Sequence, residues 1–324
     1  MEDIRLAHGA GGEEMDALIA SIRGILGDTA AWKHGDSDAA TFDLGDGRHI
    51  CFTTDSYTVE PLFFPGGDIG HLATSGTIND LCMMGAKPLG LSMGLIVEEG
   101  MPGKEISAIM ETIARLSKKT GIPIATGDTK VLDKGKVDKV LINTAGVGIV
   151  KEGNILAKPI EEGDTIILSG GLGEHAVALL SRRFDFETPV ISDSKPLIEE
   201  VKGIKYNIKV CKDPTRGGLA SALNEIAHQG GHGIDIHEDW VPIRKEVRRT
   251  CDMLGLDPLQ LACEGRLVCV CPDEKKDKVL QHLKQFNQDA AIIGAVKGKD
   301  VVLRTRIGAR ILPKPRGALV PRIC

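Results

Sequence analysis

Aromatic residues and long apolar runs are scarce in this sequence. Only 3 % of its 324 residues are Phe, Trp or Tyr, and no hydrophobic stretch reaches the length that spans a membrane. The opening residues Met1, Glu2 and Asp3 lack the basic and apolar character of a signal peptide. The eight cysteines are scattered, without the spacing of a disulfide framework or a usual zinc site. We therefore expect a cytoplasmic protein with reduced thiols and no membrane segment.

An excess of basic charge is missing as well. The formal net charge is -5, which argues against nucleic acid as a partner, because that function usually needs a basic surface. Glycine, in contrast, is abundant, with 39 residues. Many glycines indicate tight loops and close backbone approaches of the kind found around phosphates. The chain length suggests two domains of ordinary size.

Strand-like and helical segments alternate along the chain and predict a two-domain α/β (α+β) fold. A Gly- and Pro-containing junction at 151–164 separates the two halves. We place the domains at 1–152 and 153–312, with a flexible tail at 313–324. In the first half the predicted strands are 48–59, 89–97, 122–126 and 137–150, and the helices 13–26, 68–84 and 103–120. In the second half the predicted strands are 165–169, 267–271 and 291–296, with a helix around 219–227.

The tail has an unusual composition and ends in a thiol, Cys324. No acidic residue follows Asp300, whereas six Arg or Lys residues do, and Pro313, Pro315, Gly317 and Pro321 disfavour a regular element. A thiol on an irregular, extended segment suits a mobile carrier of an acyl-type group. The alternative is a frayed end whose last residue happens to be cysteine.

Three aspartates, Asp55, Asp80 and Asp128, occur at predicted edges of strands or in a helix before a glycine. Carboxylate oxygens are ligands that Mg²⁺ prefers, usually together with nucleotide phosphates. If folding brings the three together, they form a metal site, and Lys130 could neutralise phosphate charge. The alternative is that each aspartate is a cap or turn residue.

Glycine-rich loops recur at three places: 8–12, 170–176 and 213–218. Each precedes a predicted helix, so its backbone amides could bind an anion. The second loop fits the pattern G-x-G-x-x-A but lacks a convincing acidic residue further on, so a dinucleotide site is weakly indicated. Ordinary tight turns are the alternative for all three.

Two further side chains could take part in proton transfer. Glu264 lies in a predicted sharp turn and could act as a general base, or it is a solvated loop residue. His175 lies in the second glycine loop, which distinguishes it from the other histidines. Cys263, Cys269 and Cys271 have the spacing C-x5-C-x-C, which is more typical of core residues than of metal ligands.

Taken together and in this order, the motifs resemble those of the HypE family of hydrogenase maturation factors across essentially the whole chain. The carboxyl-terminal Pro-Arg-Ile-Cys is the most specific match, while the internal motifs alone indicate the wider superfamily typified by aminoimidazole ribonucleotide synthetase. The matching segments are His8–Gly12, Thr54–Ser56, Asn79–Leu81 with Met84–Ala86, Gly127–Lys130, Asp213–Gly218 and Pro321–Cys324.

The resemblance implies a homodimer whose N-terminal domain strands form a shared barrel beside an ATP-binding groove. It implies that the carbamoyltransferase HypF places a carboxamide on the Cys324 thiol. ATP-dependent dehydration of that group yields a thiocyanate, and the cyano group passes to iron on the HypC–HypD complex for the [NiFe] hydrogenase centre.

The resemblance also implies roles for individual residues. Mg²⁺ would be held by Asp55, Asp80 and Asp128. Lys130 and Glu264 would polarise and deprotonate the thiocarboxamide, with His175 as a further catalytic candidate, although Ala176 replaces an expected glycine beside it. The nucleotide would be bound by these aspartates and by His8, Gly9, Gly11, Gly12, Asn79, Thr129 and Asp213.

Two other functions fit the same residues. The first is a small-molecule kinase or synthetase of the same superfamily, for which Cys324 is dispensable. The second is a non-catalytic scaffold whose basic tail docks a partner.

Overall fold

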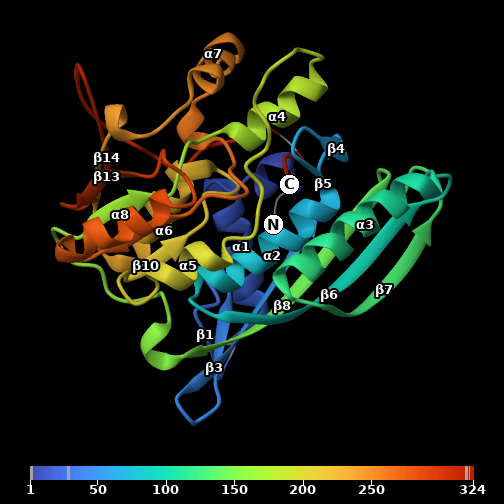
Figure 1. Ribbon diagram of the computed structural model, residues 1–324, viewed down its shortest axis with the longest axis horizontal. Coiled ribbons are helices and arrows are strands. Elements are labelled where there is room, and N and C mark those ends of the chain that lie inside the picture. Colours follow the sequence, from blue (N-terminus) through green and yellow to red (C-terminus); the bar gives the residue numbers. More distant parts are fainter. Residues whose placement is uncertain (1–2, 28–29, 318–319, 321) are drawn as a thin grey trace.

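Two large β-sheets organise the chain (Figure 1). The computed structural model describes residues 3–27, 30–317, 320 and 322–324; Pro321 of the Pro-Arg-Ile-Cys motif lies outside this range. The first sheet runs in the order β1 (Trp32–Lys33), β2 (Ala40–Asp43), β3 (Arg48–Tyr57), β8 (Val140–Lys151), β6 (Lys87–Glu98) and β7 (Ile124–Leu132). A small ribbon pairs β4 (Phe63–Phe64) with β5 (Gly67–Asp68).

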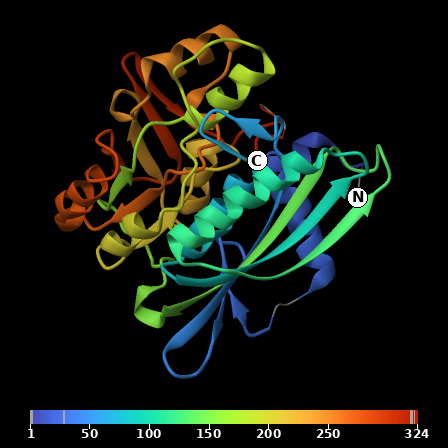
Figure 2. The ribbon, with the colours of Figure 1, turned by 45° about the vertical axis from the view of Figure 1, so that its right-hand side comes forward.

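Three α-helices accompany the first sheet: α1 (Glu13–Leu26), α2 (Ile69–Met83) and α3 (Gly103–Thr120). A short 3₁₀ helix, Leu6–Gly9, precedes α1. In α3, Ile109, Ile113 and Leu116 recur at helical spacing and are buried, and the helix ends where Gly121 adopts a φ of 73°. Figure 2 shows α3 on the same side of the sheet as α2.

Helix α2 lies between the two sheets and is the central element of the fold. Every residue of α2 except His71 and Asp80 is buried. Its Ile78, Cys82 and Met83 share one apolar cluster with residues 197–211 of the second half. A helix that is apolar on nearly all sides is a buried one, so the few polar side chains of α2 are fixed at the boundary between the domains.

Strand β3 alternates between the two faces of its sheet. Thr53 and Tyr57 are buried on the side of α2, whereas Phe52 is 46 % exposed on the opposite side. The paired strand β8 approaches α2 closely at Gly146, where a Cβ atom would stand 2.8 Å from Thr77 Cγ2. The absence of a side chain at Gly146 therefore permits the short distance between sheet and helix.

The second sheet has seven strands and is surrounded by helices. Its order is β10 (Val210–Lys212), β12 (Val268–Cys271), β9 (Thr165–Leu168), β13 (Ala291–Val296), β11 (Ile234–His237), β14 (Val301–Thr305) and β15 (Gly308–Ile311). The helices are α4 (Glu174–Arg183), α5 (Ile198–Ile204), α6 (Gly218–Gly230), α7 (Lys245–Leu254) and α8 (Lys276–Lys284). Short 3₁₀ helices occupy 152–154, 238–240, 258–260 and 273–275.

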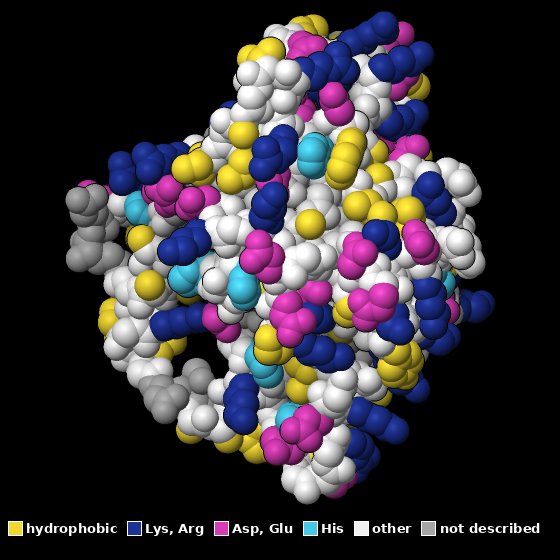
Figure 3. All heavy atoms as spheres, turned by 90° about the vertical axis from the view of Figure 1, so that its left-hand side faces the viewer, with side chains coloured by type: hydrophobic (Ala, Val, Ile, Leu, Met, Phe, Trp, Pro, Cys, Tyr) yellow, Lys and Arg dark blue, Asp and Glu magenta, His cyan; other side chains and the backbone are white. Residues whose placement is uncertain are grey.

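The surface of this second half carries charges of both signs. On the face in Figure 3, basic and acidic side chains are interspersed, and Lys and Arg gather at the upper end, where α7 lies. Several of these charges are paired, as in Arg306–Asp239 at 3.0 Å and Arg304–Asp235. Among the described residues no helix is long and apolar enough to cross a membrane.

The α/β class and the predicted helices are confirmed, with the helix over 103–120 matching α3 in both bounds. Two strand boundaries are corrected. Strand β3 ends at Tyr57 rather than at 59, and Asp55 lies within the strand rather than at its edge, because the pairing with β8 runs through Tyr57. Strand β7 runs to Leu132 rather than ending at 126, because it pairs in parallel with β6, so Gly127–Lys130 lies within the strand.

Replacing Gly146 by alanine should destabilise the protein, because the added methyl group meets Thr77, Leu81 and Leu91 atoms at 2.8–3.1 Å. We expect a loss of about 1–3 kcal/mol in the free energy of unfolding, measured by urea denaturation. Gly90→Ala in β6 is the matched control, since its nearest new contact would be an ordinary 3.5 Å. Equal stabilities of the two variants would contradict the role given to Gly146.

Candidate active site

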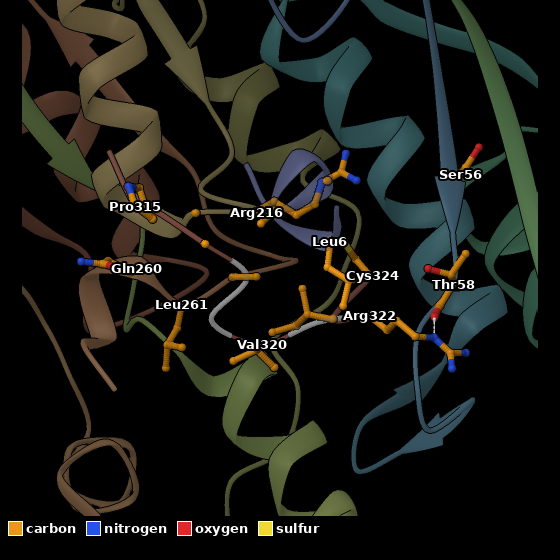
Figure 4. A pocket seen from close by; sticks show the side chains of 16 residues that line it. Leu6, Ser56, Thr58, Arg216, Gln260, Leu261, Pro315, Val320, Arg322 and Cys324 are labelled. Carbon is orange, nitrogen blue, oxygen red and sulfur yellow. Dashed lines mark hydrogen bonds between the residues drawn. The ribbon is translucent and has the colours of Figure 1, made fainter. Parts of the chain in front are cut away.

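The last residues of the tail dock beside the segment that follows β3. The Thr58 amide donates to the Cys324 carbonyl at 3.2 Å, and the Glu60 amide donates to the Arg322 carbonyl at 3.1 Å. Arg322 Nε in turn donates to the Thr58 carbonyl at 2.9 Å (Figure 4). The tail thus runs antiparallel to 58–60, and backbone groups define its register.

Two side chains of α4 hold the other side of the docked tail. His175 is fully buried, and its Nε2 lies 2.8 Å from the Ile323 carbonyl oxygen. Arg183 donates to the carbonyls of Arg322 and Glu60, both at 2.6 Å. The Ile323 side chain is 7 % exposed and belongs to the apolar cluster around α4. His175 therefore binds the tail backbone in this structure.

Cys324 lies in a cavity between the two domains. The cavity has a volume of about 280 Å³. Figure 4 shows Cys324 between Arg216 and Leu6 on one side and Val320 on the other. Burial raises the pKa of the Cys324 thiol, and Glu264 adds to this effect. The lining also includes Gly9, Ala10, Ser56, Thr58, Gly217, Gln260, Leu261, Ala262, Pro315, Gly317, Arg322 and Ile323.

Glu264 is a buried carboxyl group near the cavity. It is 3 % exposed, and its Oε1 has no hydrogen-bond partner among the described residues. Burial raises the pKa of Glu264 well above its usual range, and Asp213, Asp193 and Asp55 raise it further while Arg216 lowers it. Once ionised, a carboxylate with a raised pKa is a stronger proton acceptor, as a general base requires.

Asp80 and Asp213 extend this acidic region across the domain boundary. Burial raises the pKa of Asp80 well above normal, and the nearby Asp55 and Asp213 add to it. The pKa of Asp213 is raised in the same way, by burial and then by Asp38. Thr53 Oγ1 donates to Asp80 at 2.8 Å. The carboxylates lie close enough to repel one another, so the site favours an added cation.

Arg216 precedes α6 and faces this acidic region. The pKa of the Arg216 guanidinium is raised chiefly by Cys324. Burial lowers this pKa, whereas Asp55 and Glu264 raise it further. The first glycine loop packs directly on it, because a Cβ at Gly11 would stand 2.4 Å from the Arg216 carbonyl oxygen. Gly12 lies similarly close to Pro315, since a Cβ there would stand 2.1 Å from the Pro315 carbonyl oxygen, whereas a Cβ at Gly9 would meet open space. The 8–12 loop and the Asp213–Gly218 loop therefore form one wall.

A chain of buried and half-buried ion pairs connects the acidic region to the base of the tail. Lys212 contacts Asp38 at 2.8 Å and Glu225 at 2.9 Å. Glu225 also lies 3.6 Å from Lys314, which pairs with Asp16 of α1 at 2.6 Å. Burial opposes the charge on Lys212, but the two carboxylates raise its pKa above normal. Positive and negative side chains alternate along this series of ion pairs, so each charge offsets the cost of burying its neighbour.

The 170–176 loop packs against the turn that carries Glu264. Arg266 donates to Glu174 at 2.8 Å, and the Gly173 amide lies 3.3 Å from Cys263 Sγ. Burial raises the pKa of Glu174 to about 7 despite Arg266. This loop therefore supports the Glu264 turn, and Cys263 is a buried member of the same packing.

Within one chain the structure does not bring Asp128 and Lys130 together with Asp55. In the strand order β3, β8, β6, β7, the paired positions connect Asp55 to Gly127 across three strand spacings. This corresponds to ~14 Å at the usual strand spacing of about 4.8 Å. The side chain at Asp128 points to the opposite face of the sheet from Gly127. Asp128 and Lys130 lie 3.4 Å apart with side chains 72 % and 66 % exposed, and Thr129 between them is exposed as well.

The sequence motifs included Gly9, Arg216 and Cys324 of the cavity lining, whereas Leu6, Thr58 and residues 260–262 were not predicted. Several supports of the site were not predicted either. Asn79 was proposed as a nucleotide ligand, yet its Oδ1 accepts from the Leu197 amide at 2.8 Å and its Nδ2 donates to the Lys195 carbonyl at 3.1 Å. Arg183 and Asp193 were not identified. No local pattern marks them, because their partners are backbone groups far away in the sequence.

Comparison with known proteins defines the class of this chain. Residues 36–150 match the N-terminal domain of AIR synthase related proteins, and residues 161–305 match their C-terminal domain. The chain is 41 % identical to the carbamoyl dehydratase HypE of Azotobacter vinelandii, over 99 % of this chain and 97 % of that protein.

Solved structures agree with this assignment. A crystal structure of a HypE–HypF complex superimposes with a TM-score of 0.86 at 41 % identity, covering 92 % of this chain and 100 % of that one. HypE in complex with ATP gives a TM-score of 0.83 at 38 % identity, covering 99 % and 100 %. Within the AIR synthase related proteins, this chain belongs to the HypE family of hydrogenase maturation proteins.

Replacing Arg183 by alanine should release the docked tail and expose Cys324. The variant loses charged hydrogen bonds to two carbonyls, each worth about 1.5–3 kcal/mol, so alkylation of Cys324 by iodoacetamide should accelerate roughly tenfold or more. The rate is read from the mass of the carboxyl-terminal peptide at mildly alkaline pH. Arg182→Ala, one residue earlier and exposed, should react like the wild type, and similar rates in both variants would refute the clamp.

Proposed function

We propose that this protein is an ATP-dependent dehydratase that converts a carboxamide carried on the Cys324 thiol into a thiocyanate during [NiFe] hydrogenase maturation. The observation that carries this proposal is the docked tail, which places Cys324 in the cavity lined by Arg216, with the buried carboxyl group of Glu264 nearby. Membership of the HypE family supports the same activity, since the relatives are carbamoyl dehydratases.

The reaction requires a poor leaving group to be made a good one. The γ-phosphoryl group of ATP moves to the carboxamide oxygen, the nitrogen loses two protons, and the C–O bond breaks to release that oxygen as phosphate. The products are a thiocyanate on sulfur, ADP and phosphate. Phosphoryl transfer of this kind depends on positioning and on cations that offset charge on the phosphate oxygens.

Glu264 and Arg216 are suited to two parts of this chemistry. Glu264 is buried near Cys324, and its Oε1 is unbonded within the described part of the chain, so it can accept a proton from the carboxamide nitrogen. Arg216 carries a fixed positive charge just before the amino end of α6, where the helix dipole also favours an anion. The 8–12 loop against it would close over the phosphates, with His8, Gly9, Gly11 and Gly12 contributing.

The acidic residues fit a divalent cation. Burial, and then repulsion from neighbouring carboxylates that include Asp55, raises the pKa values of Asp80 and Asp213, a penalty that a bound cation would relieve. Mg²⁺ when bound would neutralise charge on the phosphates. Among the described residues no group of three such side chains is already arranged to hold a metal ion, which suits Mg²⁺ because it takes several ligands from phosphate and water.

A homodimer would explain the position of Asp128, Thr129 and Lys130. Strand β7 is the edge of the first sheet and is exposed along nearly its whole length, with Val131 67 % exposed. Long uncovered edges are pairing surfaces. In a dimer whose N-terminal sheets close into a shared barrel, Lys130 and Asp128 of one copy would reach the acidic region of the other.

Loading of the thiol requires the tail to leave the cavity. The docked environment raises the pKa of the Cys324 thiol, so the nucleophilic thiolate is disfavoured there. A carbamoyltransferase such as HypF would therefore act on the undocked tail in the cytoplasm. The dehydrated cargo would likewise be presented outside the cavity, to the iron-bearing HypC–HypD complex.

The rival functions make different demands on these residues. A kinase acting on a free small molecule would need room for its substrate, yet the docked tail occupies the cavity and shares its lining. A non-catalytic scaffold would have no use for the buried Glu264 Oε1, which has no hydrogen-bond partner among the described residues.

Mass spectrometry of the carboxyl-terminal peptide tests the proposal. After incubation with HypF, carbamoyl phosphate and ATP, Cys324 should gain a carboxamide and then lose one water. Asp80→Asn should retain the carboxamide but slow water loss by about 10–100-fold or more, as expected for a disturbed metal site. Asp43→Asn on β2, which is exposed, is the control. Dehydration that proceeds without ATP, or a free product that survives Cys324→Ala, would exclude this function.

Mixing two inactive variants tests the dimer. Lys130→Ala removes the contribution of β7 and Cys324→Ala removes the carrier, so neither homodimer should form thiocyanate. In a mixed dimer, the Lys130→Ala chain keeps its thiol and receives Lys130 from the other copy, so part of the activity should return. If Lys130 acts within its own chain, mixing restores nothing.

A further inference from the structure

A buried, irregular segment between α4 and α5 touches both the docked tail and the Glu264 turn. Ser192, Asp193 and Ser194 are 7–8 % exposed, although they belong to no helix or strand. Buried irregular backbone is rare because its polar groups need specific partners. Here the Ser192 amide donates to the Pro65 carbonyl at 2.8 Å, which fixes the segment against the first domain.

Ser192 determines how His175 holds the tail. The Ile323 carbonyl can only accept, so the 2.8 Å contact with His175 Nε2 places the ring proton on that nitrogen. Burial lowers the pKa of His175, which favours a neutral ring whose Nδ1 is an acceptor. Ser192 Oγ lies 2.8 Å from Nδ1 and donates to it, while its oxygen accepts from the Ser194 amide at 3.1 Å. The hydroxyl therefore selects the tautomer that binds the tail.

Asp193, the next residue, holds the backbone of the Glu264 turn. Its side chain is completely buried, and its two oxygens accept from the Glu264 and Gly265 amides, each at 3.3 Å. Arg266 lies 3.7 Å away and offsets the charge. A Cβ at Gly265 would stand 1.8 Å from the Asp193 carbonyl oxygen. Because Glu264 Oε1 has no partner among the described residues, its placement depends on this backbone.

We propose that Ser192 and Asp193 are positioning residues that keep the tail-borne cargo on Cys324 in register with Glu264. The inference rests on the proposed function, since it assigns no chemistry of its own to the pair. The two residues are adjacent, so a small movement of their segment carries the tail anchor and the Glu264 turn together. The distance between the carboxamide nitrogen on Cys324 and the Glu264 carboxylate thereby stays constant.

This separation matters because proton transfer needs hydrogen-bond reach. A general base must lie about 2.6–3.2 Å from the atom that loses its proton, and a misplacement of about 1 Å can cost about a hundredfold in rate. The described tail residues are bound through their backbone carbonyls, and Glu264 is in a turn. His175 of α4 holds the Ile323 carbonyl and Asp193 holds the Glu264 amide, so the 192–193 dipeptide contacts the supports of both.

The test compares Ser192→Ala and Asp193→Asn with Ser194→Ala. Ser194 is an ideal control because its Oγ makes a similar 3.0 Å contact with a histidine, His71 of α2, but touches neither the tail nor Glu264. Full-length protein is first loaded with a carboxamide on Cys324. Three quantities are then measured: water loss from the carboxyl-terminal peptide after ATP addition, ATP affinity by equilibrium dialysis, and iodoacetamide alkylation of unloaded Cys324.

We expect both positioning variants to lose water roughly ten- to a hundredfold more slowly than wild type, with ATP affinity unchanged. Ser192→Ala should also speed alkylation of Cys324, whereas Asp193→Asn should not, because only the serine acts on the tail. If the two residues only stabilised the fold, the two variants would not differ in the alkylation rate of Cys324 in this way. Ser192→Ala removes one hydroxyl and carries the test even if Asp193→Asn fails to fold.

Rates of water loss in both variants equal to that of Ser194→Ala would overturn the inference while leaving the proposed function intact. A wild-type protein that bears the carboxamide and loses no water on addition of ATP would instead contradict the proposed function itself, and the inference with it.

Discussion

Carboxylate crowding at the boundary between two domains is the constraint on which the rest of this structure depends. Asp55 comes from β3, Asp80 from α2, Asp213 from the loop before α6, and Glu264 from the turn before β12. Desolvation and mutual repulsion raise the pKa values of Asp80, Asp213 and Glu264. Such an arrangement opposes folding unless other interactions offset it, and the extensive apolar surface of α2, buried against both sheets, provides that offset.

The same boundary receives the tail, and it does so mostly through backbone contacts. Amides of Thr58 and Glu60 together with His175 and Arg183 bind three consecutive carbonyl groups. Binding of this type fixes where the sulfur is placed but depends little on side-chain shape. A carrier must be held long enough for chemistry and then released, and a few polar contacts around one buried isoleucine meet both needs.

Sequence patterns predicted the elements well where burial is one-sided. Helix α3 was found with its bounds because Ile109, Ile113 and Leu116 mark one face and Gly121 ends it. Family resemblance then indicated Cys324 in the cavity and Glu264 near it. The strand extent of β7 was missed because residues 127–130 are glycine or polar and all of 127–132 are exposed, so they show no alternation between buried and exposed positions.

The supports of the site were beyond prediction for a different reason. Asp193 lies in a stretch without helix or strand periodicity, and its partners at 264 and 265 are about seventy positions away. Asp128 carried a recognisable motif, yet strand order and pleating determine which face it points to, and neither quantity is present in local sequence. Interactions between distant backbone groups emerge only when the fold is known.

The ion-pair chain that ends at Lys314 has a kinetic consequence. Lys314 is tied to Asp16 and Glu225, so release of the last three residues would leave the tail attached at its base. The remaining ten residues, 315–324, extend at most ~33–36 Å. A sulfur confined to that radius samples the cavity at an effective concentration of about a millimolar or more. Return of the loaded thiol is then an intramolecular step, insensitive to how dilute the protein is.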